Sequence, residues 1–497
     1  MTELMKDTEI VERFLESGVN LHPQVLAEIK KSENLEETIS RLLTIVRRSN
    51  ASVLTPELVH GESSDQKPEK VEVRRRRKRV EAEEHESELL IKRKNDVTGR
   101  SMSQGNIESF VSYFSSRYEK LSAILKSRKE LREAVSVEHV LQGRQREVSL
   151  IGMVSDVRTS RRGNVILELE DPTGTVPVVV LSEEREMMRE VREVTRDEVL
   201  GVRGFLSNGG NMVIAKEIFF PEVPHREPKR SDAPVAVALI SDVHVGSTKF
   251  LKEVFLRFVR WLRGELGTSR QKQLAGRVKY VFVGGDLVDG VGIYPEQKEE
   301  LAVKDIQEQY ALFARLIARL PEHIEVVVLP GNHDAARQAE PQPAIEEEFA
   351  PQLYQNPRVH MVGNPCFASV HGVSVVSYHG RSLDDMIASI PGLSYTSPAR
   401  AMQLMLRKRH LSPVYGGRVP LAPELEDHLV LEEPPEILHM GHVHRTEVSS
   451  YRGTLVVNSG TFQEQTEFQR RMNIQPTPGR VPIVDLQSMR TTIMRFV

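Results

Sequence analysis

The chain has 497 residues, of which 39% are hydrophobic and 28% charged, and a formal net charge of -3 at pH 7. Its length exceeds the usual span of one hydrophobic core, so we expect two or three domains. The single cysteine, Cys366, excludes an intrachain disulfide and a cysteine-ligated zinc or iron–sulfur site. The N-terminus is charged where a signal peptide would be apolar, and nowhere do about 18 uncharged apolar residues run together. We therefore predict a cytoplasmic protein without a membrane partner.

The first 105 residues divide into a helical part and a charged part. From Ile10 to Arg48 apolar residues recur at helical spacing, which predicts a compact helical bundle over residues 1–50. Residues 51–105 lose this period and gain Ser, Pro and charge, including RRRRKR from Arg74 to Arg79 followed by EAEEHESE. Such charge blocks are usually solvated tethers, and a nucleic-acid contact is the alternative. We predict a charged flexible linker over 51–105.

A helix followed by a small β barrel is predicted for residues 106–223. The helical period returns in IESFVSYFSSRYEKLSAILKSR, and apolar–polar alternation dominates from REVSLIGMV onward. Short β-rich runs broken by RRGN, DPTG and SNGGN indicate a five-stranded barrel of the OB type. OB barrels often bind single strands by aromatic stacking, but few aromatics occur here outside Phe205, Phe219 and Phe220. The barrel therefore either contacts DNA directly or serves as a packing platform.

Strands and helices alternate after the Pro-rich connector PEVPHREPKRSDAP. Helical patterns separate the apolar runs VAVALIS, KYVFVGG and IEVVVLP, which predicts an α/β layered domain over residues 224–497. Later runs continue this domain, with antiparallel hairpins toward the end; they are GVSVVSYHG, EILHMGH, GTLVVNSG, VPIVDL and TTIMRFV.

Polar residues of one chemical kind stand where five of these apolar runs end. In chain order they are Asp242 and His244, Asp286 and Asp289, Asn332 with His333 and Asp334, His379, and His442 with His444. Each alone is usually a turn former or a satisfied polar residue. Ligands of open α/β sheets bind beyond the carboxyl ends of the strands, so we expect the five sets to converge on one crevice.

These side chains suit a pair of divalent cations. Mn²⁺, Fe²⁺ and Zn²⁺ accept carboxylate, amide and neutral imidazole ligands, and two ions about 3.5 to 4 Å apart need a bridging ligand. Asp286 is the natural bridge between them. Glycines at the strand ends are expected to leave room for the backbone and for a phosphate to approach closely; they are Gly284, Gly285, Gly331, Gly380 and Gly441.

The ordered set DxH, GDxxD, GNHD, lone His and GHxH resembles the motifs of the calcineurin-like metallophosphoesterase superfamily, which includes two-manganese DNA exonucleases and serine/threonine phosphatases. The resemblance implies two metal sites that share one ligand; the first is Asp242, His244, Asp286 and His444, and the second is Asp286, Asn332, His379 and His442. It also implies a bridging hydroxide as nucleophile, His333 as the catalytic histidine and Asp289 as its carboxylate partner. Arg381 either touches the phosphate or forms a surface salt bridge.

The order of domains narrows the resemblance further. A helical domain, a charged linker, an OB-like barrel and a phosphoesterase together resemble the small subunit of archaeal family-D DNA polymerase, a relative of the eukaryotic polymerase B subunits. The most similar stretches are GDLVDGVGIYPEQ, LPGNHDAARQAEPQPAI, YHGRSLDD and MNIQPTPGR. This resemblance implies a proofreading 3′–5′ exonuclease with two divalent ions. Mn²⁺ is the expected ion, and Fe²⁺ or Zn²⁺ is the alternative. It also implies three partners: a large polymerase subunit, single-stranded or primer–template DNA, and a sliding clamp.

Two other functions stay open. One alternative to the exonuclease is an accessory scaffold with incidental cleavage. The other is a free-standing phosphatase or cyclic-nucleotide diesterase. Eukaryotic relatives have lost metal ligands and act as scaffolds, whereas every ligand position is filled in this sequence. No aspartate pair suits nucleotide addition, so synthesis is expected to require a separate subunit.

Overall fold

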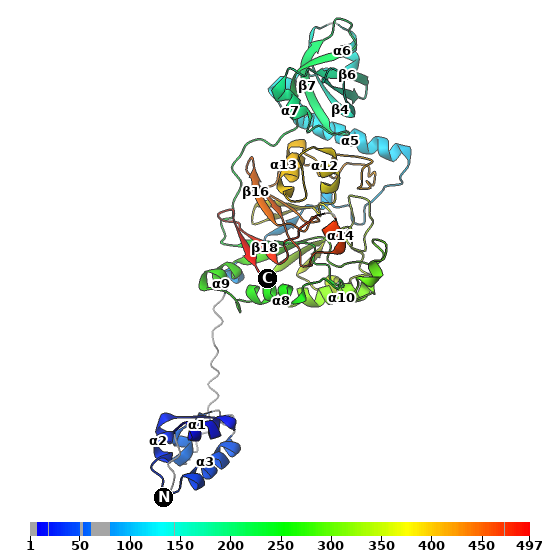
Figure 1. Ribbon diagram of the computed structural model, residues 1–497. Coiled ribbons are helices and arrows are strands. Elements are labelled where there is room, and N and C mark those ends of the chain that lie inside the picture. The colour runs from blue at the N-terminus through cyan, green and yellow to red at the C-terminus, as the bar shows by residue number, and fades with distance from the viewer. Residues whose placement is uncertain (1–6, 18, 50–52, 61–79, 144, 472) are drawn as a thin grey trace. The chain divides into compact units, whose positions relative to one another are not determined.

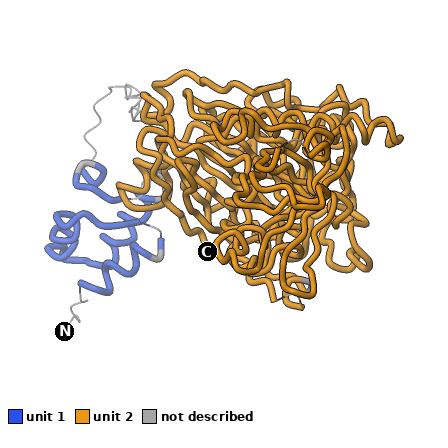
Figure 2. Tube along the Cα trace, turned by 90° about the horizontal axis from the view of Figure 1, so that it is seen from above, with its two compact units in different colours: residues 1–77 blue, residues 78–497 orange. Residues whose placement is uncertain are grey.

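The structure is a computed structural model that describes residues 7–17, 19–49, 53–60, 80–143, 145–471 and 473–497. The chain divides into two compact units, Met1–Arg77 and Lys78–Val497 (Figure 2). The basic run Arg74 to Arg79 was predicted to be a tether or a nucleic-acid contact. This run lies outside the described residues. No helix in the described ranges has the length and apolar character needed to span a membrane.

The first unit contains short helices around one apolar core. Its elements are α1 (Asp7–Glu16), β1 (Asn20–Leu21), α2 (Pro23–Ile29), α3 (Leu35–Ser49), β2 (Val53–Leu54) and α4 (Pro56–His60). Phe14, Val25 and Leu54 are fully buried in this core. Because β1 and β2 pair in parallel, the bundle continues past the boundary expected at residue 50.

The predicted five-stranded barrel is present in the second unit (Figure 1). Its strands are β4 (Glu147–Thr159), β5 (Val165–Asp171), β6 (Gly174–Val180), β7 (Val199–Leu206) and β8 (Val213–Phe219). They close in the order β4-β5-β6-β8-β7. Alternate residues of β6, namely Val176, Val178 and Val180, fill the interior, as the two-residue period of a strand requires.

One long helix lies between the barrel and the rest of the second unit. This helix is α5 (Ile107–Lys126), which begins where the Asn106 side chain accepts a hydrogen bond from the backbone N–H of Ser109. Its Leu121 and Leu125 are buried together with barrel residues and with Val430. Smaller helices accompany the barrel; they are η3 (Lys129–Leu131), α6 (Val137–Leu141) and α7 (Arg185–Val191).

Two six-stranded sheets form the layered domain predicted from residue 224 onward. The first sheet has the order β12-β11-β10-β9-β18-β19 and the second the order β16-β17-β15-β14-β13-β3. The strands of the first sheet are β9 (Ala236–Ile240), β10 (Val278–Gly284), β11 (Glu325–Leu329), β12 (Val359–Met361), β18 (Arg480–Asp485) and β19 (Arg490–Arg495). Those of the second are β3 (Leu89–Ile91), β13 (Cys366–Val370), β14 (Val373–Ser377), β15 (Ile437–Met440), β16 (Glu447–Tyr451) and β17 (Thr454–Asn458).

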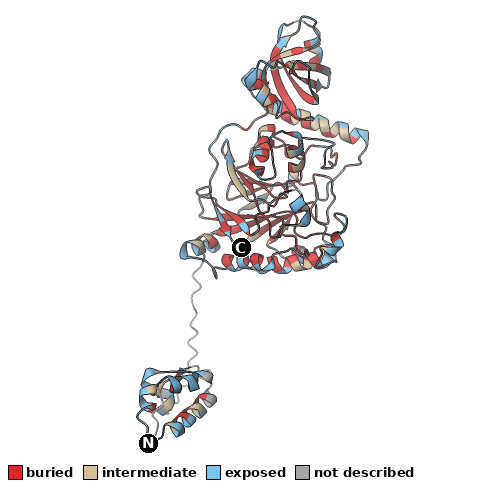
Figure 3. Ribbon diagram, in the orientation of Figure 1, coloured by how far each residue is buried: buried red, intermediate tan, exposed pale blue. Residues whose placement is uncertain are grey.

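Helices cover the outer face of each sheet, giving four layers (Figure 1). The first sheet is covered by α8 (Lys252–Leu262), α9 (Ser269–Ala275), α10 (Ile306–Ile317) and α11 (Pro351–Tyr354), and the second by α12 (Leu383–Ser389) and α13 (Pro398–Lys408). Between the sheets, Leu239 and Phe282 of the first pack with Val375 and Ile437 of the second. Figure 3 shows the sheets as largely buried ribbon. Two short elements, η4 (Gln297–Glu299) and α14 (Glu467–Arg471), lie in loops.

The C-terminal half of the predicted linker is part of this domain, which corrects the expectation of a flexible segment up to residue 105. The segment contains η1 (Glu81–Glu84), β3 and η2 (Arg93–Asn95), and β3 pairs with β13 at the edge of the second sheet. Arg277 pairs with Glu81, and Lys279 donates to the carbonyl oxygen of Ala82. The acidic residues therefore dock on a basic edge of the domain.

Candidate metal centre

The five predicted sets of polar residues meet where parallel strands of both sheets end. β9, β10 and β11 are parallel neighbours, so the segments that follow them lie at one edge of the first sheet. β14 and β15 are parallel neighbours in the second sheet and lead to His379 and His442. Packing the two sheets face to face thus brings both sets of strand ends together.

One cluster contains Asp242, His244 and His444, whose donor atoms lie within 4.8 Å of one another. Nε2 of His444 is 3.4 Å from a carboxylate oxygen of Asp242 and 3.0 Å from Nε2 of His244. Nδ1 of His244 lies 3.1 Å from the Asp289 carboxylate, and Nδ1 of His444 lies 2.8 Å from the Gln469 amide nitrogen. Since each ring is held at Nδ1, both Nε2 atoms converge on the same point beside a carboxylate, and this donor set fits a divalent cation.

Asp286 lies between this cluster and a second one. Its Oδ2 atom is 3.7 Å from Nε2 of His244 and 3.5 Å from Nε2 of His379. The amide oxygen of Asn332 lies 3.0 Å from the same His379 nitrogen. Asp286 thus occupies the position that a ligand shared by two ions would need.

Among the predicted carboxylate and imidazole ligands, His442 belongs to none of the groups whose donor atoms lie within 4.8 Å of one another. Its ring centroid is 5.2 Å from that of His379, and its Nε2 is 3.1 Å from the Asp384 carboxylate. Only Nδ1 of His442 therefore remains as a donor for a cation. The backbone N–H of His442 donates to the Asp242 carboxylate at 3.0 Å, which ties the second sheet to the first cluster.

Several predicted ligands have a left-handed backbone conformation that is rare for residues other than glycine. The φ angles are 53° at Asp242, 53° at His244, 51° at Asp286, 68° at His442 and 56° at His444. Such conformations are unfavourable and persist only where the surrounding structure holds them, most often at functional sites. Tight turns directly after the strands thus aim these side chains at a common point.

The strand-end glycines make room for the backbone, as predicted, and also for the predicted ligand side chains. A β-carbon at Gly331 would lie 2.2 Å from the Asp286 carboxylate, and one at Gly285 would lie 2.6 Å from Nδ1 of His379. These glycines therefore make room for the ligand side chains themselves. A β-carbon at Gly285 would also lie 2.8 Å from the backbone of Gly331, so the predicted close approach of the backbone is confirmed there, and the approach of a phosphate stays a prediction.

His333 and Asp289 meet through a different atom from the one expected. Nδ1 of His333 lies 2.8 Å from the backbone carbonyl oxygen of Asp289, so Nδ1 donates and Nε2 stays available. The Asp289 carboxylate instead contacts His244 and the side chains of Gln297 and Gln463. The role of Asp289 as carboxylate partner of His333 is therefore corrected, because its carboxylate orients a predicted metal ligand.

Burial and neighbouring charges set the protonation of the cluster. Burial opposes both charges, yet Asp286 and His379 favour each other's charged form, which lowers the pKa of Asp286 well below its ordinary value and raises the pKa of His379 to about 10. Burial lowers the pKa of His333, although the negative charge of Asp286 acts to raise it. A histidine must be neutral to coordinate a cation, so ion binding at His379 requires loss of this proton.

Arg381 lies beside the centre and is hydrogen-bonded to Gln338. Its guanidinium donates to the backbone oxygen and to the side-chain oxygen of Gln338, whose amide donates to the carbonyl of Asn332. No carboxylate in the described ranges forms an ion pair with Arg381. The expected surface salt bridge is thus not seen in that part of the chain, where Nη1 of Arg381 is held by Gln338.

Sequence reasoning missed a buried chain of hydroxyl and imidazole groups behind Asp242. The Ser241 hydroxyl donates to the Asp242 carboxylate and lies 2.6 Å from the Ser459 hydroxyl. His439 continues the chain, with Nε2 3.0 Å from Ser459 and Nδ1 2.9 Å from the Ser377 hydroxyl. A histidine inside the apolar run EILHM was the available signal.

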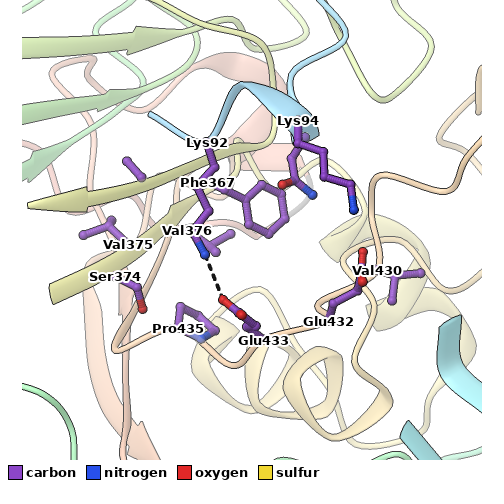
Figure 4. A pocket seen from close by; sticks show the side chains of 12 residues that line it. Lys92, Lys94, Phe367, Ser374, Val375, Val376, Val430, Glu432, Glu433 and Pro435 are labelled. Carbon is purple, nitrogen blue, oxygen red and sulfur yellow. Dashed lines mark hydrogen bonds and ion pairs between the residues drawn. The ribbon is translucent and has the colours of Figure 1, made fainter. Parts of the chain in front are cut away.

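Two cavities in the described part of the chain lie away from this centre. One of about 300 Å³ is lined by residues including Phe367 and is crossed by the ion pair between Lys92 and Glu433 (Figure 4). Another of about 770 Å³ runs along α5. Neither is lined by a predicted site residue, so cavity size does not identify the site in this chain.

Two families match parts of the chain. Residues 237–449 match the family of the B subunits of DNA polymerases alpha and epsilon, and residues 148–221 match the OB-fold nucleic acid binding domain. The second match confirms the predicted type of barrel. Among solved structures, a novel archaeal phosphodiesterase covers 52% of this chain and 99% of its own at 10% identity and a TM-score of 0.27, a likeness too low to carry an argument.

Similar curated proteins share one description, "DNA polymerase II small subunit". That of Methanothermobacter thermautotrophicus is 41% identical over 484 residues, which is 97% of this chain and 98% of the relative. That of Archaeoglobus fulgidus is 42% identical over 481 residues, or 95% of each chain. That of Pyrococcus abyssi is 42% identical over 388 residues, 77% of this chain and 62% of the relative.

Proposed function

Because the chain belongs to the family of archaeal DNA polymerase II small subunits, we propose that it is the proofreading 3′–5′ exonuclease of its polymerase. A small subunit of a two-subunit DNA polymerase implies a large catalytic subunit as partner. The proposed substrate is the 3′-terminal phosphodiester of single-stranded or primer–template DNA. The sliding clamp is a further proposed partner, and the cytoplasm, which keeps Cys366 reduced, is the proposed location.

The position of Asp286 between two imidazole–carboxylate clusters carries this proposal. We assign the layered domain to the calcineurin-like metallophosphoesterases and propose two divalent ions, Mn²⁺ before Fe²⁺ or Zn²⁺. Asp242, His244, Asp286 and His444 would hold one ion, and Asp286, Asn332, His379 and His442 the other. Such a pair, when bound, lowers the pKa of a shared water and neutralises charge on the phosphate.

His333 supplies the acid–base group in this proposal. Its backbone N–H donates to Asp286 and its Nδ1 to the Asp289 carbonyl, which fixes the ring and leaves Nε2 to exchange a proton with substrate. General acid catalysis by such a group typically contributes about 10² to 10⁴-fold. Arg381 is proposed to contact the phosphate, since its guanidinium has no carboxylate partner among the described residues.

Digestion of matched and 3′-mismatched primers in Mn²⁺ tests the proposal. The wild-type chain is expected to shorten both primers, alone and with the large subunit, and His333→Ala to lose about 10² to 10⁴-fold of this rate. His360→Ala is the matched control, because His360 pairs with Glu325 on the neighbouring strand and belongs to neither cluster.

Measuring assembly with the large subunit distinguishes the nuclease function from the scaffold function. His333→Ala is expected to retain wild-type affinity for the large subunit, because His333 lies at the metal centre. If the wild-type chain assembles with the large subunit but never shortens DNA, the nuclease function is wrong and the scaffold function is supported. A chain that cleaves small phosphoesters and ignores DNA ends would indicate the free-standing phosphatase.

A further inference from the structure

The loop Gly290–Glu300 lies directly against His333. A β-carbon at Gly290 would sit 2.3 Å from the backbone oxygen of His333, and the left-handed φ of 75° at Gly290 likewise favours glycine. The ring centroid of Tyr294 is 6.3 Å from that of His333, with the planes inclined at 64°. The loop thus brings one aromatic side chain to the outer side of the proposed acid–base residue.

Hydrogen bonds at both ends hold this loop in place. Gln297 donates to the backbone oxygen of Asp289 at 2.8 Å and accepts from the backbone N–H of Ile293 at 2.9 Å. The Tyr294 hydroxyl donates to Glu300 at 2.9 Å, and the backbone oxygen of Glu300 accepts from Thr248 at 2.9 Å. The ring of Tyr294 is therefore anchored at its hydroxyl end and needs no ordering when a ligand arrives.

Apolar surface of the loop stays exposed beside the centre. Val291 is 39% exposed, and Tyr294 is partly exposed. Tyr294 contacts no aromatic ring other than His333 among the residues that the structure describes. A partly exposed ring that is held in place beside a proposed site for nucleic acid is typical of a stacking platform for a nucleobase.

We propose that Tyr294 stacks on the penultimate nucleobase, which belongs to the nucleotide that carries the departing 3′-oxygen. This proposal rests on the exonuclease function and deepens it. Hydrolysis forms a bond from a water oxygen to phosphorus and breaks the bond from phosphorus to the 3′-oxygen. One water proton is released and the other stays on the phosphate product, while the departing oxygen receives the Nε2 proton of His333 in its imidazolium form, which solvent then replaces. The nucleotide attached to that oxygen must therefore lie on the His333 side of the phosphate, where Tyr294 stands.

Oligonucleotides that lack one base test which nucleobase stacks on Tyr294. Removing the penultimate base is expected to slow wild-type digestion about 10-fold, because stacking on one aromatic ring contributes at that level. The same removal should not slow Tyr294→Ala further. Tyr294→Phe keeps the ring but loses the hydrogen bond to Glu300, so the removal should still slow it, by no more than it slows the wild type. Removing the terminal base should slow all three to the same degree. An equal penalty for the penultimate abasic site in all three proteins would overturn the proposal and leave the nuclease standing.

A binding measurement judges the stacking even if cleavage fails. Single strands carrying 2-aminopurine at the penultimate position are bound to each protein with Ca²⁺ in place of Mn²⁺. Stacking quenches the fluorescence of 2-aminopurine, so its emission should be lower with wild type and Tyr294→Phe than with Tyr294→Ala. When the probe is the terminal base, its emission should be the same with all three proteins. Tyr354→Ala controls for loss of an exposed tyrosine elsewhere, since Tyr354 is 37% exposed and donates to the backbone of Ile345. Equal emission with all four proteins would contradict stacking.

Discussion

Asp242 owes its orientation to groups that touch no substrate. The chain Ser241, Ser459, His439 and Ser377 runs from its carboxylate into the space between the two sheets, and each member is buried. Burial lowers the pKa of His439 to about 3, so its ring is neutral and bridges two hydroxyl groups. Groups that orient a metal ligand in this way typically change metal affinity by about 10 to 100-fold when removed.

His439→Ala should therefore weaken Mn²⁺ binding by about 10-fold or more. The substitution removes the bridge between Ser459 and Ser377, so the Ser377 hydroxyl loses its imidazole partner, while the Ser459 hydroxyl keeps its contacts with Ser241 and the backbone oxygen of Met440. Titration of free Mn²⁺ by electron paramagnetic resonance measures the affinity without reference to activity. His439→Gln, whose amide offers a donor and an acceptor, should retain more affinity than His439→Ala; equal affinity of both variants and wild type would contradict the role.

The convergence of Asp242, Asp286 and His379 on one site was predictable from sequence, while the contacts of Asp289 were not. Asp242, Asp286 and His379 stand directly after apolar runs, and the carboxyl ends of parallel strands share an edge. Whether Asp289 meets His333 by its carboxylate or its carbonyl depends on the backbone turn that follows β10. Gln297 and Gln463 fix the carboxylate from loops that no spacing rule connects.

The short edge strand β3 shows where element prediction failed. Long buried strands such as β10 read as continuous apolar runs and were predicted. β3 has three residues, LLI, between charged segments, and its pairing with β13 depends on an edge that lies far along the chain. Composition indicates a solvated tether there, because the basic partners Arg277 and Lys279 are not local.

Arg277→Ala should loosen this anchored segment. Arg277 makes two hydrogen bonds to Glu81, 2.8 and 3.1 Å long, and a third to Asp485. Removing it leaves the segment held by β3 and by the hydrogen bonds of Ala82 and Glu88, so amides of residues 81–91 should exchange faster with deuterium. Arg260→Ala, which removes an exposed pair with Glu265, is the control and should leave that exchange unchanged. Equal protection in both variants would show that β3 needs no electrostatic anchor.

Buried charges join the barrel to the layered domain across the second unit. Arg117 of α5 is fully buried and donates to Asp427 at 2.8 Å, to the backbone of Pro413 at 2.9 Å and to the backbone of Asp197 at 3.1 Å. Lys408 and Glu198 form a second buried pair at 2.6 Å. Sequence indicated the barrel and the layers separately; it could not indicate their fixed junction, because Arg117 and Asp427 are 310 residues apart.

Asp427→Asn should destabilise this junction in a pH-dependent way. Burial opposes ionisation of Asp427, but His410 and Arg117 outweigh it and hold the pKa of this carboxyl well below its ordinary value of 3.8. A lowered folded-state pKa contributes stability that is complete above 3.8 and declines as pH falls below it. Breaking such a buried pair costs about 3 to 5 kcal/mol near neutral pH, since Arg117 keeps an uncompensated charge.

Urea unfolding of the wild type and Asp427→Asn between pH 7 and pH 2.5 measures this difference in the free energy of unfolding. The gap should be constant from pH 7 to about 5 and narrow steadily below about pH 4, because the wild-type carboxylate then gains protons in the unfolded state first. Glu426→Gln is the neighbouring control; its exposed pair with Lys120 at 3.1 Å should contribute about 0 to 1 kcal/mol. A gap that stays constant down to pH 2.5 would mean that packing of Asp427, and not its charge, joins the barrel to the sheets.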